Sequence, residues 1–125
     1  MRPRVYVIED EDSVRESLKA LLDAVGWETR AYATAAGFLS AFPERDTTQP
    51  QCLVVDIELP GMNGRDLLSE LNRREESIPA IVMTGHGDNE LESLAAERNA
   101  VGYFQKPFNT TELLNTISNV LAQTT

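Results

Sequence analysis

Five times along this chain, a short apolar run precedes a segment whose apolar residues recur with helical spacing. The runs lie at residues 5–8, 27–33, 52–56, 80–84 and 101–104. The spacing that follows them predicts helices at 13–25, 34–42, around 67–71, at 89–98 and from 109 or 110 to 121. Strict alternation of strand and helix requires parallel strands joined by right-handed crossovers. The pattern therefore predicts an α/β protein.

We expect a three-layer (βα)5 fold, with a five-stranded parallel sheet covered by helices on both faces. One strand order that satisfies the connection rules is the flavodoxin-like order 2-1-3-4-5. In that order the first and third strands are neighbours, and the loop at residues 9–12 lies beside Asp56. In that loop, Asp12 or Ser13 is expected to cap the first helix.

Length, charge and cysteine content limit the possible functions. At 125 residues, the whole chain 1–125 is expected to form one domain. The lone Cys52 excludes an internal disulfide and fits a reducing compartment. No apolar run approaches the roughly 20 residues that span a bilayer, so we expect a cytoplasmic protein without membrane contact. A net charge of −9 argues against nucleic-acid binding by this domain.

The stretch CLVVDIELPGMNG, at residues 52–64, places a carboxylate at the end of a buried strand. Its apolar run ends on Asp56, and proline, glycine and asparagine follow at once. On this stretch alone, Asp56 fits a turn cap about as well as a functional group. Other predicted strands also end on polar side chains, and these are Glu9 and Asp10, Thr84 and Lys106.

Converging carboxylates repel one another unless a cation neutralises them. Oxygen ligands of this kind suit Mg²⁺, which protein sites often hold with one or two carboxylates and a phosphate oxygen. Thr84 and Lys106 offer a hydroxyl and an ammonium group to an incoming phosphoryl group. The set favours Asp56 as a nucleophile that forms an aspartyl-phosphate.

The sequence resembles the receiver domains of two-component response regulators along its whole length. The fragments TGHGD and QKPF are most similar to receivers of FixJ-type transcriptional regulators. The family's motifs match, in chain order, the acidic pair Glu9 and Asp10, the phospho-accepting Asp56, the switch hydroxyl Thr84, the switch aromatic Tyr103 and the lysine Lys106.

The resemblance implies phosphoryl transfer from a sensor histidine kinase to Asp56, with Mg²⁺ as cofactor. The implied metal ligands are Asp10, Asp56 and the backbone carbonyl of Glu58, with Glu9 acting through water. It also implies a cis peptide bond before Pro107. The chain would then be a signalling domain rather than an enzyme, with only self-phosphorylation and self-dephosphorylation chemistry.

In the family, phosphorylation moves Thr84 and Tyr103 and alters the surface of the fourth helix, fifth strand and fifth helix. That surface would control a transcriptional output domain absent from this chain, and it could form a homodimer. One alternative is a stand-alone receiver-fold interaction module. Another is a haloacid-dehalogenase-like phosphatase, although Glu58 stands where that class has an aspartate. A flavodoxin-like nucleotide binder is disfavoured, because the acidic loop 9–12 would repel phosphate.

Overall fold

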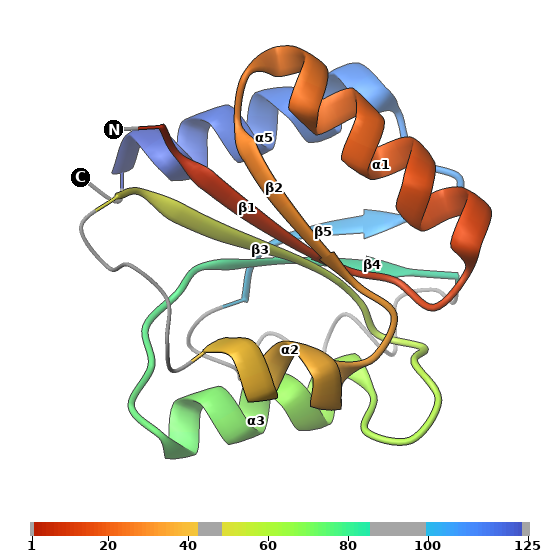
Figure 1. Cartoon of the computed structure of the whole chain (residues 1–125), viewed down its shortest axis with the longest axis vertical. Helices are drawn as coiled ribbons and strands as arrows, with labels where there is room; N and C mark the ends of the chain where they lie inside the picture. Colours follow the sequence, from red (N-terminus) through yellow and green to blue (C-terminus); the bar gives the residue numbers. More distant parts are fainter. Residues whose placement is uncertain (1, 43–48, 86–99, 124–125) are drawn as a thin grey trace.

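The structure is a computed structural model that describes residues 2–42, 49–85 and 100–123 (Figure 1). The strands in these ranges are β1 (Arg4–Ile8), β2 (Glu28–Tyr32), β3 (Gln51–Asp56), β4 (Ala80–Thr84) and β5 (Ala100–Gln105). The helices are α1 (Asp12–Val25), α2 (Ala35–Ala41), α3 (Gly64–Arg73) and α5 (Thr110–Gln123). The helix expected at 89–98 lies outside the described residues.

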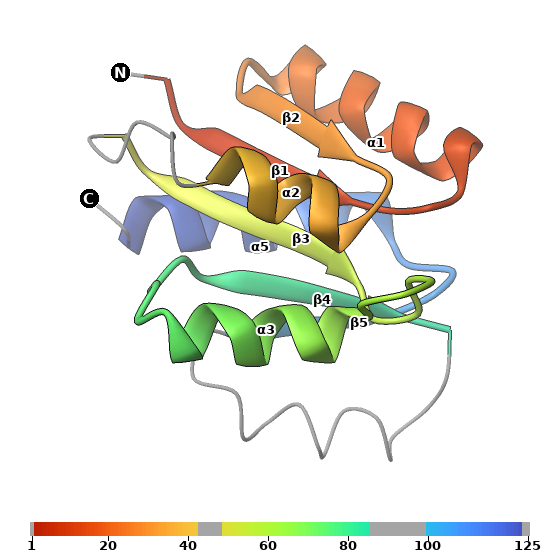
Figure 2. The same cartoon turned by 60° about the horizontal axis from the view of Figure 1, so that its bottom comes forward.

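The five strands form one parallel sheet in the order β2-β1-β3-β4-β5. Helices α1 and α5 cover one face of this sheet, and α2 and α3 cover the other (Figures 1 and 2). The predicted fold class and strand order are therefore confirmed. Because all strands run the same way, their carboxyl ends meet at one edge.

Each face of the sheet has its own apolar core. Alternate residues of a strand point to opposite faces, so Tyr6 and Ile8 join α2 and α3 in one cluster, while Val5 and Val7 join α1 and α5 in the other. All six residues of β3 are buried, as expected for a strand in the middle of a sheet with two covered faces. Asp56 therefore lies at the end of a strand that is buried along its whole length.

The first helix begins differently from the prediction. Its N-cap residue is Glu11, whose side chain makes no capping hydrogen bond, and the helix starts at Asp12. The Asp12 carboxylate instead pairs with the Arg15 guanidinium one helical turn later, at 2.6 Å. The expected cap by Asp12 or Ser13 is thus wrong, because the helix already begins at Asp12 and both residues lie inside its first turn.

The start of α3 lies very close to the end of β3. The Gly64 amide donates to the carbonyl of Ile57 at 3.0 Å. A Cβ atom at position 64 would lie 2.7 Å from both the Asp56 carbonyl oxygen and the Ile57 Cα. These are backbone atoms and cannot swing aside as a side chain could. Glycine is therefore required here for the chain to turn directly beneath Asp56.

No helix in the described parts of the chain is long and apolar enough to cross a membrane.

We predict that Gly64→Ala lowers the free energy of unfolding by about 1–3 kcal/mol, the usual cost of forcing an extra carbon into a packed site. Urea denaturation of the variant measures this loss. Gly37→Ala in α2 is the matched control, since its Cβ would meet only the Thr34 hydroxyl, at 3.1 Å, and the Tyr32 ring, at 3.9 Å. Equal stability of the two variants would contradict the argument.

Candidate functional site

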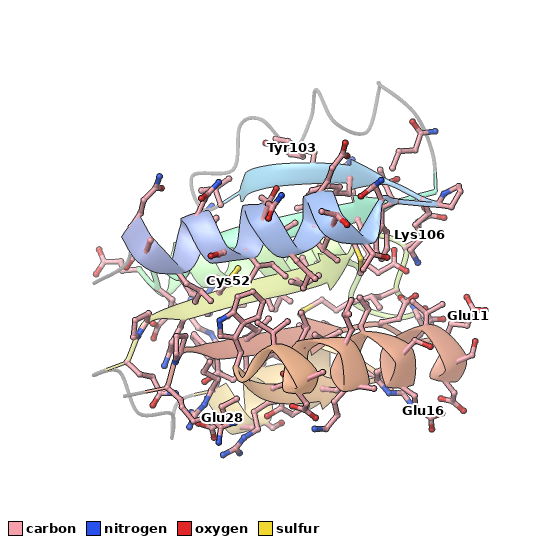
Figure 3. All side chains as sticks on the ribbon, turned by 90° about the horizontal axis from the view of Figure 1, so that it is seen from above. Glu11, Glu16, Glu28, Cys52, Tyr103 and Lys106 are labelled. Atoms are coloured by element: carbon pink, nitrogen blue, oxygen red, sulfur yellow. The ribbon has the colours of Figure 1, made fainter. Side chains whose placement is uncertain are left out.

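Backbone hydrogen bonds that continue the sheet fix the positions of the candidate residues. The Glu9 amide donates to the carbonyl of Tyr32 in β2, at 3.0 Å. The Lys106 amide donates to the carbonyl of Thr84, at 2.7 Å, so Lys106 stays beside the end of β4. Figure 3 shows Lys106 and Glu11 at the same end of the sheet, with Cys52 toward the other end.

A single ammonium group joins two acids that are far apart in the sequence. Lys106 Nζ donates to Glu9 Oε1 and to Asp56 Oδ2, both at 2.8 Å. The Glu9 side chain is fully buried and the Asp56 side chain is 5% exposed, whereas that of Lys106 is 26% exposed. Two buried carboxylates thus share one partly accessible cation, which offsets much of the cost of burying them.

The surroundings of Glu9 and Asp56 shift the pKa values of these two carboxyl groups in opposite directions. Burial, reinforced by the neighbouring Asp56 carboxylate, raises the pKa of Glu9 from 4.5 to about 7, although Lys106 opposes the shift. Burial would also raise the pKa of Asp56. Hydrogen bonds involving Glu9, Lys106 and the Glu58 amide outweigh that effect and lower the pKa. Asp56 therefore stays ionised at neutral pH, which is the state that a nucleophilic role would require.

The acidic residues fit a divalent cation. Glu9, Asp10 and Asp56 each offer a carboxylate oxygen, and these atoms lie within 4.8 Å of one another. In the described part of the chain, no hydrogen-bond partner meets the buried Glu9 Oε2. Asp10 is exposed and lines an open hollow of about 510 Å³ together with Glu58. A hard cation such as Mg²⁺ matches this donor set.

Thr84 and Glu58 meet across the gap between β3 and β4. The buried Thr84 hydroxyl donates to Glu58 Oε1 at 3.4 Å, and the Gly85 amide donates to the same oxygen. The Glu58 amide in turn donates to Asp56 Oδ1 at 2.9 Å. The sequence predicted a role only for the Glu58 backbone carbonyl, so these side-chain contacts are new.

The remaining candidates lie on β5 and just after it. Tyr103 is half-buried and packs against the core cluster shared by α2 and α3. The bond between Lys106 and Pro107 is cis, as expected from the resemblance. Tyr103 is thus next to the core without being enclosed by it.

Arg15 also supports the site, although the sequence analysis predicted no role for this residue. Its guanidinium donates to the backbone carbonyls of Glu9, at 2.9 Å, and of Asp10, at 3.5 Å, besides pairing with Asp12. It therefore ties the loop that carries both acids to the first turns of α1. The spacing of Asp12 and Arg15, three residues apart on a helix, was the available signal.

Comparison with known proteins agrees with this fold. A family model described as "Response regulator receiver domain" matches residues 5–118. The chain belongs to this family, and it is a FixJ-like receiver domain of two-component signalling. The resemblance predicted from the motifs is confirmed.

The curated relatives include two proteins named "Transcriptional regulatory protein FixJ". That of Azorhizobium caulinodans is 43% identical over 105 residues, which cover 84% of this chain and 48% of the relative. That of Bradyrhizobium diazoefficiens is 34% identical over 119 residues, covering 95% and 57%. The chain thus spans about half the length of these relatives.

Solved structures give the same result. Full-length FixJ from B. japonicum is 34% identical, with a TM-score of 0.85, and the match covers 97% of this chain and 58% of that one. The response regulator StyR is 35% identical, with a TM-score of 0.87, covering 99% and 61%.

The raised pKa of Glu9 predicts a pH dependence of stability. The folded chain holds this proton up to a pKa of about 7, whereas the ordinary value is 4.5. The folded state therefore binds more protons between these values, and the free energy of unfolding should fall as pH rises through the window. Glu9→Gln should remove that slope. The lowered pKa of Asp56 changes the free energy of unfolding only at pH values below this window.

Urea denaturation in chelator, at about pH 5 and about pH 7.5, measures the slope on either side of the Glu9 transition. The exposed Glu11 provides the matched variant Glu11→Gln, which should keep the wild-type slope. The same slope in all three proteins would contradict the assignment.

For Arg15, we predict that Arg15→Met weakens Mg²⁺ binding by about tenfold, as expected when a group that orients metal ligands is lost. Arg15→Lys, which keeps the charge, should recover part of the affinity. Lys19→Met is the control, because it removes only the exposed pair with Asp23. Calorimetric titration with Mg²⁺ tests the prediction, and unchanged affinity in Arg15→Met would refute it.

Proposed function

We propose that this chain receives a phosphoryl group on Asp56 from the phosphohistidine of a sensor histidine kinase. The observation that carries the proposal is the ammonium group of Lys106, 2.8 Å from Asp56 Oδ2, at the edge of the sheet where the acids converge. A carboxylate kept ionised and flanked by a cation is suited to attack phosphorus.

In the transfer, an oxygen of Asp56 forms the new bond to phosphorus while the phosphorus–nitrogen bond breaks. The electron pair of that bond leaves with the imidazole. Lys106 neutralises charge on the transferring group, and it is accessible enough to do so. Thr84 donates a hydrogen bond to a phosphoryl oxygen. Positioning and charge neutralisation supply most of what such a transfer needs.

We propose that Asp10, Asp56 and the backbone carbonyl of Glu58 hold Mg²⁺, with Glu9 acting through water. The buried, unpartnered Glu9 Oε2 and the cluster of three carboxylates support this set. The metal would neutralise charge on the phosphoryl oxygens.

A second hollow, of about 290 Å³, supports a protein partner. It is lined mainly by α1 and also by Phe108 and Thr110, which follow Lys106 in the chain. A partner that docks there would bring its phosphohistidine close to the site. A kinase partner and the free Cys52 also fit the expected cytoplasmic location.

The proposed output is a change in the surface formed by residues 89–98, β5 and α5, driven by Thr84 and Tyr103. Residues 89–98 lie outside the described part of the chain. Tyr103 is half-buried against a core cluster, and in this proposal its ring would turn further inward. Val101, on the edge strand β5, is 50% exposed and would be covered in a homodimer. We propose that this surface controls a transcriptional output domain in a longer protein, without direct nucleic-acid binding by the receiver.

The test is incubation of the domain with acetyl phosphate and Mg²⁺, followed by intact mass measurement. We expect one added phosphoryl group, released by hydroxylamine, and none in Asp56→Asn. Asp23→Asn, at the far end of α1, is the control and should be modified like the wild type. An adduct that resists hydroxylamine, or that persists in Asp56→Asn, would overturn the proposal. Turnover of added phosphoesters would instead support a phosphatase.

A further inference from the structure

The Glu58 carboxylate accepts hydrogen bonds from two donors that lie near Asp56. One of its oxygens, Oε1, accepts hydrogen bonds from both the Thr84 hydroxyl and the Gly85 amide. The carboxylate also lies close against Gly85, since a Cβ built at that position would be 3.0 Å from Oε1. The exposed Glu58 side chain therefore extends from the end of β3 to the end of β4.

The backbone of Glu58 explains this reach. Its amide donates to Asp56 Oδ1, so the chain turns back over the phosphate-accepting carboxylate directly after β3. Lys106 takes the other Asp56 oxygen, Oδ2. The Glu58 amide and the Lys106 ammonium thus each donate to one oxygen of Asp56. The Glu58 side chain accepts from the next two donors along the sheet edge, the Thr84 hydroxyl and the Gly85 amide.

We propose that the Glu58 carboxylate is an internal stand-in for the phosphoryl group. In the unphosphorylated chain it holds the Thr84 hydroxyl and the Gly85 amide, the donors that phosphoryl oxygens on Asp56 would take, and it leaves them when Asp56 is modified. This inference rests on the proposed function, since it names a competitor at that same site.

The physical reason is that two anionic groups compete for one pair of donors. A carboxylate oxygen and a phosphoryl oxygen both accept strong hydrogen bonds from a hydroxyl and an amide. The Glu58 charge also opposes the approach of an anionic phosphodonor. Glu58 therefore slows phosphorylation and holds Thr84 in its resting position until the phosphoryl group replaces it.

The contact is tested without any phosphodonor by following the Gly85 amide in ¹H–¹⁵N NMR spectra. We expect Glu58→Ala to shift this signal upfield and to speed its exchange with solvent, because the amide loses its acceptor. Glu11→Ala removes the same charge from an exposed side chain that makes no capping bond, and it should leave the signal in place. An unchanged Gly85 signal in Glu58→Ala would overturn the proposal.

The competition is tested by the rate of phosphorylation with acetyl phosphate at saturating Mg²⁺. We expect Glu58→Ala to react about tenfold faster than the wild type, as for the loss of one competing charge-assisted hydrogen bond. Gly85→Ala should also react faster, because its methyl group displaces the carboxylate without changing the net charge. Glu11→Ala should stay within about twofold, since solvent screens an exposed charge.

The outcomes separate this inference from the function on which it rests. If wild type is not modified at Asp56, the proposed function fails. If wild type is modified at Asp56 but Glu58→Ala is no faster than Glu11→Ala, only the role of Glu58 fails. A slower rate in both Glu58→Ala and Gly85→Ala would mean that the carboxylate assists the transfer, and this too would overturn the proposal.

Discussion

The ammonium group of Lys106 is the interaction on which the site depends. It lies 2.8 Å from the buried carboxylates of Glu9 and Asp56, which belong to the ends of two different strands. Without a cation, like charges buried this close would force protons onto the acids or push the strand ends apart. With it, the pKa of Asp56 lies below its ordinary value, whereas burial and the neighbouring Asp56 carboxylate still raise the pKa of Glu9 to about 7.

Sheet topology brings these groups together. In the order β2-β1-β3-β4-β5, β3 has β1 on one side and β4 on the other, so Asp56 lies between the acidic loop and Thr84. Lys106, at the end of β5, reaches Asp56 from two strands away, and its backbone is held by the carbonyl of Thr84. A parallel sheet with this order thus converts strand ends that are distant in sequence into one site.

The secondary contacts explain how tightly the site is organised. Arg15 binds the carbonyls of the acidic loop, and Gly64 lets α3 begin directly under the end of β3. The Glu58 carboxylate takes the donors that Thr84 and Gly85 offer. Each of these contacts lies within a few residues of a β-strand end, so small changes in loop sequence can adjust the chemistry without altering the sheet.

The sequence alone determined the α/β class and the residue types at the carboxyl edge of the sheet, and it limited the strand order to a few allowed topologies, one of which is observed. It did so because the apolar period and the turn residues are local signals, and because few parallel topologies are allowed. It also gave the family, through motifs at matching strand ends. The cap of α1 was predicted wrongly, because the helix begins at Asp12 and Glu11 stands at the N-cap position.

Only the tertiary structure decided which atoms meet. Side-chain reach and burial are set by packing between elements, so no local pattern could show that Lys106 bridges both acids or that Glu58 crosses to Thr84 and Gly85. The same holds for the opposed acidities of Glu9 and Asp56, because a pKa depends on burial and on neighbours that come from other strands.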